Sequence, residues 1–481
     1  MPRIPYVASC LLAVLCLAAE PAGAQKAGAS GSPAAVGDSA AEGTKAVEST
    51  ATLFGHSDGA RWLVLGQANV VFQAHGPFHS PYAGANSLLG RGEYKTSLVG
   101  TLFLGYELRR SPGSHLEVLY NEESAGGRGI SEALGLAGFT NLDVVRNPTL
   151  GPLPYLARVQ VHGTVGLSNA VSETTRGPFA LATTVPARRL ELRIGKMGLP
   201  DFFDLNSVGS DSHLQFLNWT VDNNGAWDYA ADTRGYTWAA VAEYVDRAVS
   251  VRYALAAMPA VANGIDFDFS LRRASGQNVE AEWRRRLLPG LAAERKGAVR
   301  VLGYANHAHM GDYREANAAF VSGTDGTPDI TRHAAFGALK YGFGLNAEQE
   351  LAAGLRVYAR FGWNEGKHES FAYTEVDQTL AAGADRSGDR WGRPLDRTGL
   401  TLVSNAIKRD HQAYLGLGGL GFLLGDGRLH YAREDILEGY YTLHTWRGVF
   451  YSLDAQYVTH PGYNADRGPV LVEAVRMHVD F

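Results

Sequence analysis

The stretch GPVLVEAVRMHVDF, residues Gly468–Phe481, ends the 481-residue sequence and is the clearest guide to its fold. From Leu471 onward every second residue is apolar, with Glu473 as the one exception. One face therefore holds Leu471, Val475, Met477, Val479 and Phe481, and the other holds Ala474, Arg476, His478 and Asp480. Such alternation predicts a β-strand with one apolar and one polar surface.

A strand of this kind suits the last position of a closed outer-membrane β-barrel. There it would pair with the first strand, turn its apolar face to lipid and turn its polar face to a wet lumen. The aromatic residue Phe481 at its end is a feature that bacterial barrels commonly present to the barrel-assembly machinery. The remaining chain must then supply the partner strands.

The first residues have the composition of an export signal. Residues 1–24 combine a basic start, an apolar run (Tyr6–Ala19) and a small-residue cleavage motif that ends at Ala24. This pattern predicts a secretory signal peptide; a membrane anchor is the alternative, but it would need roughly 18 or more apolar residues. Both cysteines, Cys10 and Cys16, lie in this segment, so we expect neither a disulfide nor thiol chemistry in the mature chain.

The rest of the sequence divides into a short spacer and one domain. Residues 25–55 are rich in Ala, Gly, Ser and Thr, which predicts a low-complexity periplasmic spacer. Residues 56–481 contain no linker or charge block, so we expect a single barrel domain there. The net charge of −5 and the pI of about 6.3 give no reason to expect nucleic acid as a partner.

Alternating segments recur throughout this domain. In the segment 93–109 the residues Leu98, Leu102 and Leu104 share one face, whereas Ser97 and Thr101 lie on the other. The pattern also appears at 62–73, 155–167, 190–194, 236–244, 249–257, 279–283, 339–347, 355–363 and 449–457. Strand-length alternation between turn signals predicts an all-β fold, a transmembrane antiparallel barrel of about 16 strands (range 16–18).

The predicted connections are of two kinds. Segments 111–114 and 446–448 are short turns, whereas 121–153, 198–233, 310–335 and 364–396 are long and rich in Gly, Asn and Asp. Short periplasmic turns and long extracellular loops are typical of outer-membrane barrels. Helical periodicity is confined to short pieces near Thr379–Ala384 and Asp410–Leu415.

Alternation alone does not separate this barrel from a water-soluble β-sandwich. Aromatic residues near strand ends favour the barrel, because they form girdles at the two membrane interfaces. The residues in question are Tyr94, Tyr106, Tyr155, Tyr236, Tyr244, Trp363 and Tyr457.

Motifs for catalysis or cofactor binding are weak. Gly416–Gly421 matches G-x-G-x-x-G, but a turn follows it instead of the helix that a dinucleotide site requires. His307 and His309 could share a metal as strand neighbours, although no further ligand cluster supports this. We therefore expect no cofactor, no metal site and no catalytic residues, and we do not expect an enzyme.

The predicted lumen carries many charged residues. Most of these charges would neutralise one another and fill space, but a few could form a ladder at a narrow point. Guanidinium and carboxylate groups can bind vicinal hydroxyls in a bidentate manner, and aromatic rings can stack on sugar faces. On the strands, the candidates for sugar contact are Arg189, Glu191, Arg193, Arg356 and Arg360.

The segment 196–234 is the candidate sugar-contacting loop, which we expect to fold inward. It concentrates short carboxylates, amides and indoles, all of which can contact a sugar. The predicted contact residues are Asp201, Asp204, Asn206, Trp219, Asn223, Asn224 and Trp227. The alternative is that Asn and Asp shape turns here, while the two tryptophans pack the loop against the wall.

Several motifs, taken together, resemble one family. They are Ser80–Leu88 (SPYAGANSL), residues 134–141 (LGLAGFTN), the segment 196–236, Gly425–Gly427, Glu438–Tyr441 and the C-terminal HPGYNADRGPVLVEAVRMHVDF. In this order they resemble the carbohydrate-selective porins of Gram-negative bacteria, the OprB-like outer-membrane porins. The resemblance implies a barrel of about sixteen strands through which sugars diffuse passively across the outer membrane.

Two other functions stay open at this stage. A non-selective porin would share every barrel feature, and an outer-membrane enzyme or adhesin could use the same scaffold. The expected partners are permeating sugars, outer-membrane lipid and the assembly machinery, and the sequence leaves a homotrimer open.

Overall fold

The computed structural model describes residues 52–57, 59–144 and 150–481. The predicted signal peptide and most of the predicted spacer lie outside these residues. Sixteen strands form one sheet: β1 (Trp62–His75), β2 (Glu93–Ser111), β3 (Ser114–Gly127), β4 (Tyr155–Gly166), β7 (Arg189–Met197), β8 (Thr237–Val245), β9 (Val249–Pro259), β11 (Ser275–Arg284), β12 (Gly297–Gly311), β13 (Ala334–Ala352), β14 (Leu355–Asn364), β15 (Gln378–Gly388), β16 (Arg393–Ala406), β17 (Glu434–Trp446), β18 (Val449–Thr459) and β19 (Val470–Asp480). The two-residue strand β10 (Phe267–Asp268) pairs antiparallel with the end of β9.

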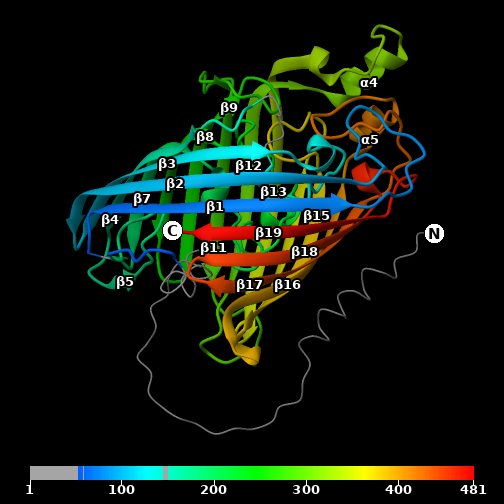
Figure 1. The fold of residues 1–481 in the computed structure, drawn as a ribbon. Helices are drawn as coiled ribbons and strands as arrows, with labels where there is room; N and C mark the ends of the chain where they lie inside the picture. The colour runs from blue at the N-terminus through cyan, green and yellow to red at the C-terminus, as the bar shows by residue number, and fades with distance from the viewer. Residues whose placement is uncertain (1–51, 58, 145–149) are drawn as a thin grey trace.

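Each of these strands pairs antiparallel with its neighbours in chain order, and β1 pairs with β19 to close the barrel (Figure 1). The closing register runs from Gln67 opposite Asp480 to His75 opposite Val472. Beyond it, Gly66 and Phe481 exchange two backbone hydrogen bonds, of 2.6 and 2.8 Å. The prediction of a closed barrel of about sixteen strands is confirmed.

The two faces of the strands are as predicted. On β2, Tyr94 and Leu102 are 72% and 39% exposed, whereas Thr101 is only 4% exposed. Apolar side chains dominate the outer face of the other strands as well, because that face contacts lipid. In β19, Leu471 and Val475 point outward, and Arg476 and His478 point into the barrel.

Two of the aromatic residues assigned to the membrane interfaces face the lumen instead. Tyr155 and Tyr236 both donate a hydrogen bond to Glu123 inside the barrel. A register shift between Asn121 and Glu122, where β3 pairs with β4, inverts the alternation at the start of β4. Tyr236 is the last residue of an inward loop and not part of β8.

The two ends of the barrel differ in their connections. At one end the strands are joined by the segments 76–92, 128–154, 198–236, 260–274, 312–333, 365–377, 407–433 and 460–469. At the other end, five of the seven connections are short, namely 112–113, 246–248, 353–354, 389–392 and 447–448. This matches the expected extracellular loops and periplasmic turns. The exceptions at the periplasmic end are 167–188 and 285–296.

The predicted loop 364–396 is correct only for residues 365–377, and the predicted helix at Thr379–Ala384 is wrong. Strand β15, whose sequence QTLAAGADRSG is rich in Ala and Gly, lies within 364–396 and includes 379–384. Small residues weaken the contrast between the two faces, so this strand lacks a clear alternation. The helical piece at Asp410–Leu415 is confirmed as part of α5 (Arg409–Gly416).

The remaining elements are short. They are the helices α3 (Trp219–Asp222) and α4 (Tyr313–Val321), the 3-10 turns η1 (Ile130–Glu132), η2 (Leu199–Asp201), η3 (Ile330–His333), η4 (Asp389–Trp391) and η5 (Pro461–Tyr463), and the small strands β5 (Val171–Glu173) and β6 (Thr184–Pro186). In the described part of the chain, none of the helices combines the length and the apolar character needed to cross a membrane.

Candidate functional site

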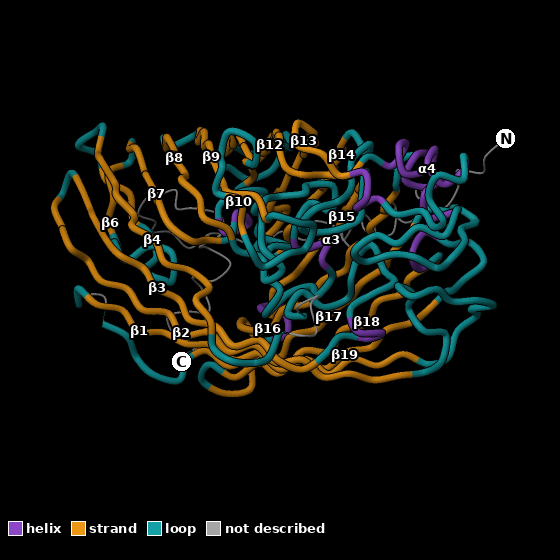
Figure 2. The backbone as a smooth tube through the Cα atoms, turned by 90° about the horizontal axis from the view of Figure 1, so that it is seen from above, coloured by secondary structure: helices purple, strands orange, loops and turns teal. Residues whose placement is uncertain are grey.

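The connection between β7 and β8, residues 198–236, folds into the barrel. Figure 2 shows α3, which belongs to this loop, together with other loop segments inside the ring of strands. Every residue from 215 to 233 is buried. A buried loop carries backbone N–H and C=O groups that water cannot reach, so the barrel wall has to bind them.

Asparagines on successive strands perform much of this role. Asn306 on β12, Asn346 on β13 and Asn364 on β14 donate to the carbonyl oxygens of Asp228, Asp204 and Ala226, respectively. An amide suits this position because it offers both donor and acceptor without a charge to bury.

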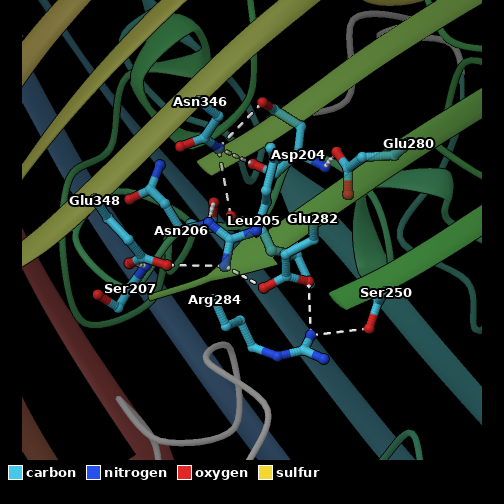
Figure 3. Close-up of polar contacts among 12 residues, drawn as sticks. Asp204, Leu205, Asn206, Ser207, Ser250, Glu280, Glu282, Arg284, Asn346 and Glu348 are labelled. Atoms are coloured by element: carbon cyan, nitrogen blue, oxygen red, sulfur yellow. Dashed lines mark hydrogen bonds and ion pairs between the residues drawn. The ribbon is translucent and has the colours of Figure 1, made fainter. Parts of the chain in front are cut away.

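Carboxylates of the wall bind the amides of the same loop. Glu280 on β11 accepts a hydrogen bond of 2.7 Å from the Asp204 N–H, and Glu348 on β13 accepts one of 2.7 Å from the Ser207 N–H (Figure 3). Glu438 on β17 accepts from the N–H groups of two further loop residues, 217 and 218. The wall formed by strands β11–β17 therefore provides hydrogen-bond partners for the loop backbone.

Arg360 is the central ion-pair contact between this wall and the loop. Its guanidinium is fully buried, lies 3.0 Å from Asp204 Oδ2 and donates to the carbonyl oxygens of Asp204 and Val221. Arg356, four residues earlier, instead pairs in a bidentate manner with Asp385 on β15. The two arginines of one predicted pair therefore have different partners, and only Arg360 contacts the loop.

Two glycines let the loop approach the strands closely. Gly344 on β13 and Gly362 on β14 pair with each other, and the side chain of Asn224 lies directly over them. A Cβ on Gly362 would lie 1.9 Å from Asn224 Oδ1, and a Cβ on Gly344 would lie 2.5 Å from Asn224 Nδ2. Any other residue at these positions would displace Asn224.

The opposite half of the lumen holds a cavity of ≈ 1270 Å³. Its lining extends from Asp480 and Phe481, at the periplasmic end, to Asn263 and Phe422 in extracellular loops. Sites that enclose a small ligand usually measure about 300–1,000 Å³. This cavity is larger than such sites, and its lining residues come from both ends of the barrel.

Charged side chains of β4 and β7 line this cavity. Glu191 lies between Arg189 and Arg193 and forms an ion pair with each, and His162 is 3.3 Å from the same carboxylate. Arg158, on the neighbouring strand β4, forms a bidentate pair with Asp201 of the inward loop, with both distances at 2.7 Å. Because each charge has a partner, these groups are held in place.

The predicted site residues therefore separate into two groups. Those that line the cavity are Arg189, Glu191, Arg193, Asp201, Asn206, Trp219 and Asn223. Those that do not line it are Asp204, Asn224, Trp227, Arg356 and Arg360. Trp227 is 1% exposed and donates to Asn278 Oδ1 on β11, so its ring packs the loop against the wall, which is the alternative given above.

The members of the first group differ in how much they present to the cavity. Trp219 is 7% exposed, stacks on Tyr373 and donates to the Asn141 carbonyl oxygen. Asn206 uses its side-chain oxygen to close a turn with the N–H groups of residues 208 and 209. Asn223 donates to Asp222, and burial raises the pKa of that carboxyl to about 7.

A histidine pair lies where the loops meet the closing strand. The ring of His213 in the inward loop stacks on that of His478 in β19, at 5.3 Å between centroids. Burial opposes the charged form of His213, but Asp143, 3.3 Å away, outweighs this effect and raises its pKa to about 9. His213 is thus cationic at neutral pH.

The groups that hold the loop are not among the predicted site residues, apart from Arg360. The asparagines that hold it occupy lumen-facing positions on consecutive strands, and this recurrence is a signal in the sequence. Phe179 and its neighbours, residues 173–180 and 182–185, line the cavity from the periplasmic end and are not among the predicted residues either. No alternation or motif marks that segment.

Comparisons with known proteins agree with this architecture. Residues 109–481 match the family model described as carbohydrate-selective porin, OprB family. The high-pH structure of OprB from Pseudomonas putida is similar, with 15% identity, a TM-score of 0.63 and coverage of 87% of this chain and 94% of that chain. The low-pH structure of the same protein gives 12% identity, a TM-score of 0.45 and coverage of 87% and 92%. No curated protein matches the chain.

Proposed function

This chain belongs to the carbohydrate-selective porin family OprB, and we propose that sugars cross its barrel through the cavity between β4, β7 and the inward loop 198–236. The chain is a sugar porin of the outer membrane. The proposal concerns the path and the residues that sugars contact. Of the predicted residues, we assign contact to Arg189, Glu191, Arg193 and Asp201, together with Arg158.

One observation carries this assignment, namely the pairing of guanidinium and carboxylate groups along the cavity. A sugar presents vicinal hydroxyls, each of which donates and accepts. The Arg189–Glu191–Arg193 cluster and the Arg158–Asp201 pair offer donors and acceptors side by side, already oriented by their partners. Contacts of this kind are strong enough to replace water and weak enough to release the solute, as passage through a channel requires.

The test is conductance of the purified protein in planar bilayers. We expect stable ion-conducting channels whose current falls as D-glucose is added, with a weaker effect from sorbitol, which has similar hydroxyls but no ring. Equal effects of the two solutes would favour a non-selective porin. A folded protein that does not conduct would favour an enzyme or adhesin on the same scaffold.

Export and assembly follow from the ends of the chain. We propose that residues 1–24 are a signal peptide, that residues 25–55 are a periplasmic spacer, and that the last strand is read by the barrel-assembly machinery. A homotrimer belongs to the same proposal and is tested by native mass measurement in detergent. We propose neither a cofactor nor catalysis for this channel.

Deleting Phe481 tests the assembly proposal. The deletion removes both backbone hydrogen bonds with Gly66 and the ring that covers this glycine. We expect a large fall in outer-membrane yield and in heat-modifiable migration on a gel. Deleting Ser322, an exposed residue directly after α4, is the control. Normal yield without Phe481 would contradict the proposal.

A further inference from the structure

The connection between β4 and β7, residues 167–188, is a long segment at the periplasmic end, and it enters the lumen. Its strands β5 and β6 form a small hairpin, and residues 173–180 and 182–185 line the cavity. A periplasmic turn that only joined two strands would stay in water outside the barrel. This segment therefore shapes the passage from the side opposite to the extracellular loops.

Buried groups of the wall hold the segment in place. Glu117 on β3 accepts hydrogen bonds from the Leu181 N–H, and Arg176 donates to the carbonyl oxygens of Leu181 and Trp62. Arg193 on β7 donates to the Phe179 carbonyl oxygen at 2.7 Å. The segment is fastened to the wall by the same kind of contacts that hold loop 198–236.

The two inserts meet at a pair of aromatic rings. Phe179 of the periplasmic segment contacts Phe202 of loop 198–236, edge to face, with centroids 6.1 Å apart. The guanidinium of Arg158 lies 5.2 Å from the Phe179 ring, and that of Arg193 lies 4.8 Å from the Phe202 ring. Phe179 lines the cavity and is half-buried, so part of its ring is accessible.

We propose that Phe179 is a sugar-contacting residue, and that segment 167–188 forms the periplasmic half of the constriction. The proposal rests on the proposed function, because it assigns a further contact to the same passage. A pyranose ring has a face of C–H groups and a rim of hydroxyls. Phe179 offers an apolar surface to the face, and Arg158 and Arg193 offer donors to the rim. An open-chain polyol lacks such a face.

Two variants separate the two roles of Phe179. Phe179→Ala removes most of the side chain and should raise single-channel conductance and the size limit for polyethylene glycols. Phe179→Leu keeps an apolar side chain but removes the ring; conductance should stay near the parent value, and block by D-glucose should weaken several-fold while the sorbitol effect stays the same. Phe269→Ala, in the extracellular connection 260–274 and outside the cavity lining, is the matched control.

The outcomes are distinct from those of the proposed function. If the parent channel is not blocked by D-glucose, the proposed function fails, yet Phe179→Ala still tests whether the segment narrows the ion path. Unchanged conductance and size limit in Phe179→Ala would overturn the periplasmic half of the constriction. Unchanged D-glucose block in Phe179→Leu would overturn the sugar contact.

Discussion

The two halves of the barrel interior use polar residues differently. On strands β11–β17 the lumen-facing positions include asparagines, carboxylates and two paired glycines, and loop 198–236 covers them. On β4 and β7 they hold Arg158, His162 and the cluster around Glu191, and these side chains line an open passage. Paired charges occur in both halves, since Arg360 pairs with Asp204 of the loop in the covered half. The covered half differs in its short amides and paired glycines, which let the loop lie directly on the strands. Alternation predicts which face is polar, but it does not show which part of that face a loop covers.

The largest effect is expected where the covered half loses its buried charge. Arg360→Ala leaves Asp204 buried without its ion-pair partner, which costs about 3–5 kcal/mol. We expect loop 198–236 to detach from the barrel wall, so that single-channel conductance rises and sugar block is lost. Conductance and D-glucose titration in bilayers measure both changes.

Arg356→Ala is the matched control for this prediction. Arg356 lies on the same strand but pairs with Asp385 and does not contact the loop. Its loss should lower thermal stability and leave the conductance nearly unchanged. Equal conductance changes in the two variants would show that the loop is held by other contacts.

A second prediction compares the inner and the outer face of one strand. Leu102→Arg places a charge in lipid, which costs roughly 2–4 kcal/mol near the bilayer midplane. Thr101→Arg places the charge in the lumen beside Glu123, which accepts a hydrogen bond from Thr101. We expect a low yield of folded protein only for Leu102→Arg, measured by heat-modifiable migration. Similar yields would mean that the faces are reversed.

A third, smaller effect is expected at the paired glycines Gly344 and Gly362, over which the Asn224 side chain lies. Gly362→Ala should push the Asn224 side chain away from the wall, and such overpacking costs about 1–3 kcal/mol. Conductance should become noisier as the loop loosens, and the melting temperature should fall. Gly303→Ala on β12 is the control, because its Cβ would make an ordinary contact of 3.6 Å. A melting temperature as high as that of the control would contradict the close approach.

The smallest effect on folding, but a direct one on selectivity, concerns the open half. Replacing Arg189 and Arg193 together by Ala leaves Glu191 with His162 as its remaining partner among the contacts described above. We expect the reversal potential to shift toward cation preference and sugar block to weaken. If both quantities stay at the parent values, these residues only fill space.

The fold was largely predictable, because a barrel needs only alternation, turn signals and closure. Leu102 and Thr101 show how directly the alternation reports the two faces. Strand β15 and the face of Tyr155 were not predictable, since small residues and a register shift remove the signal. The site was predictable in part. Arg189, Glu191 and Arg193 line the passage, but nothing local distinguishes Arg360 from Arg356, because their roles depend on loop 198–236, which comes from a distant part of the chain.

The seam between β1 and β19 has a consequence for how the molecule folds. It joins residues nearly as far apart in sequence as the described chain allows, and contacts of such high contact order form slowly. Until they form, both strands are free edges, which can pair with any other strand available, including one from a second molecule. The barrel is free of edges only when its most distant contacts have formed. An unclosed barrel therefore exposes two strand edges to pairing with other molecules, and a factor that shields those edges protects the protein while it folds.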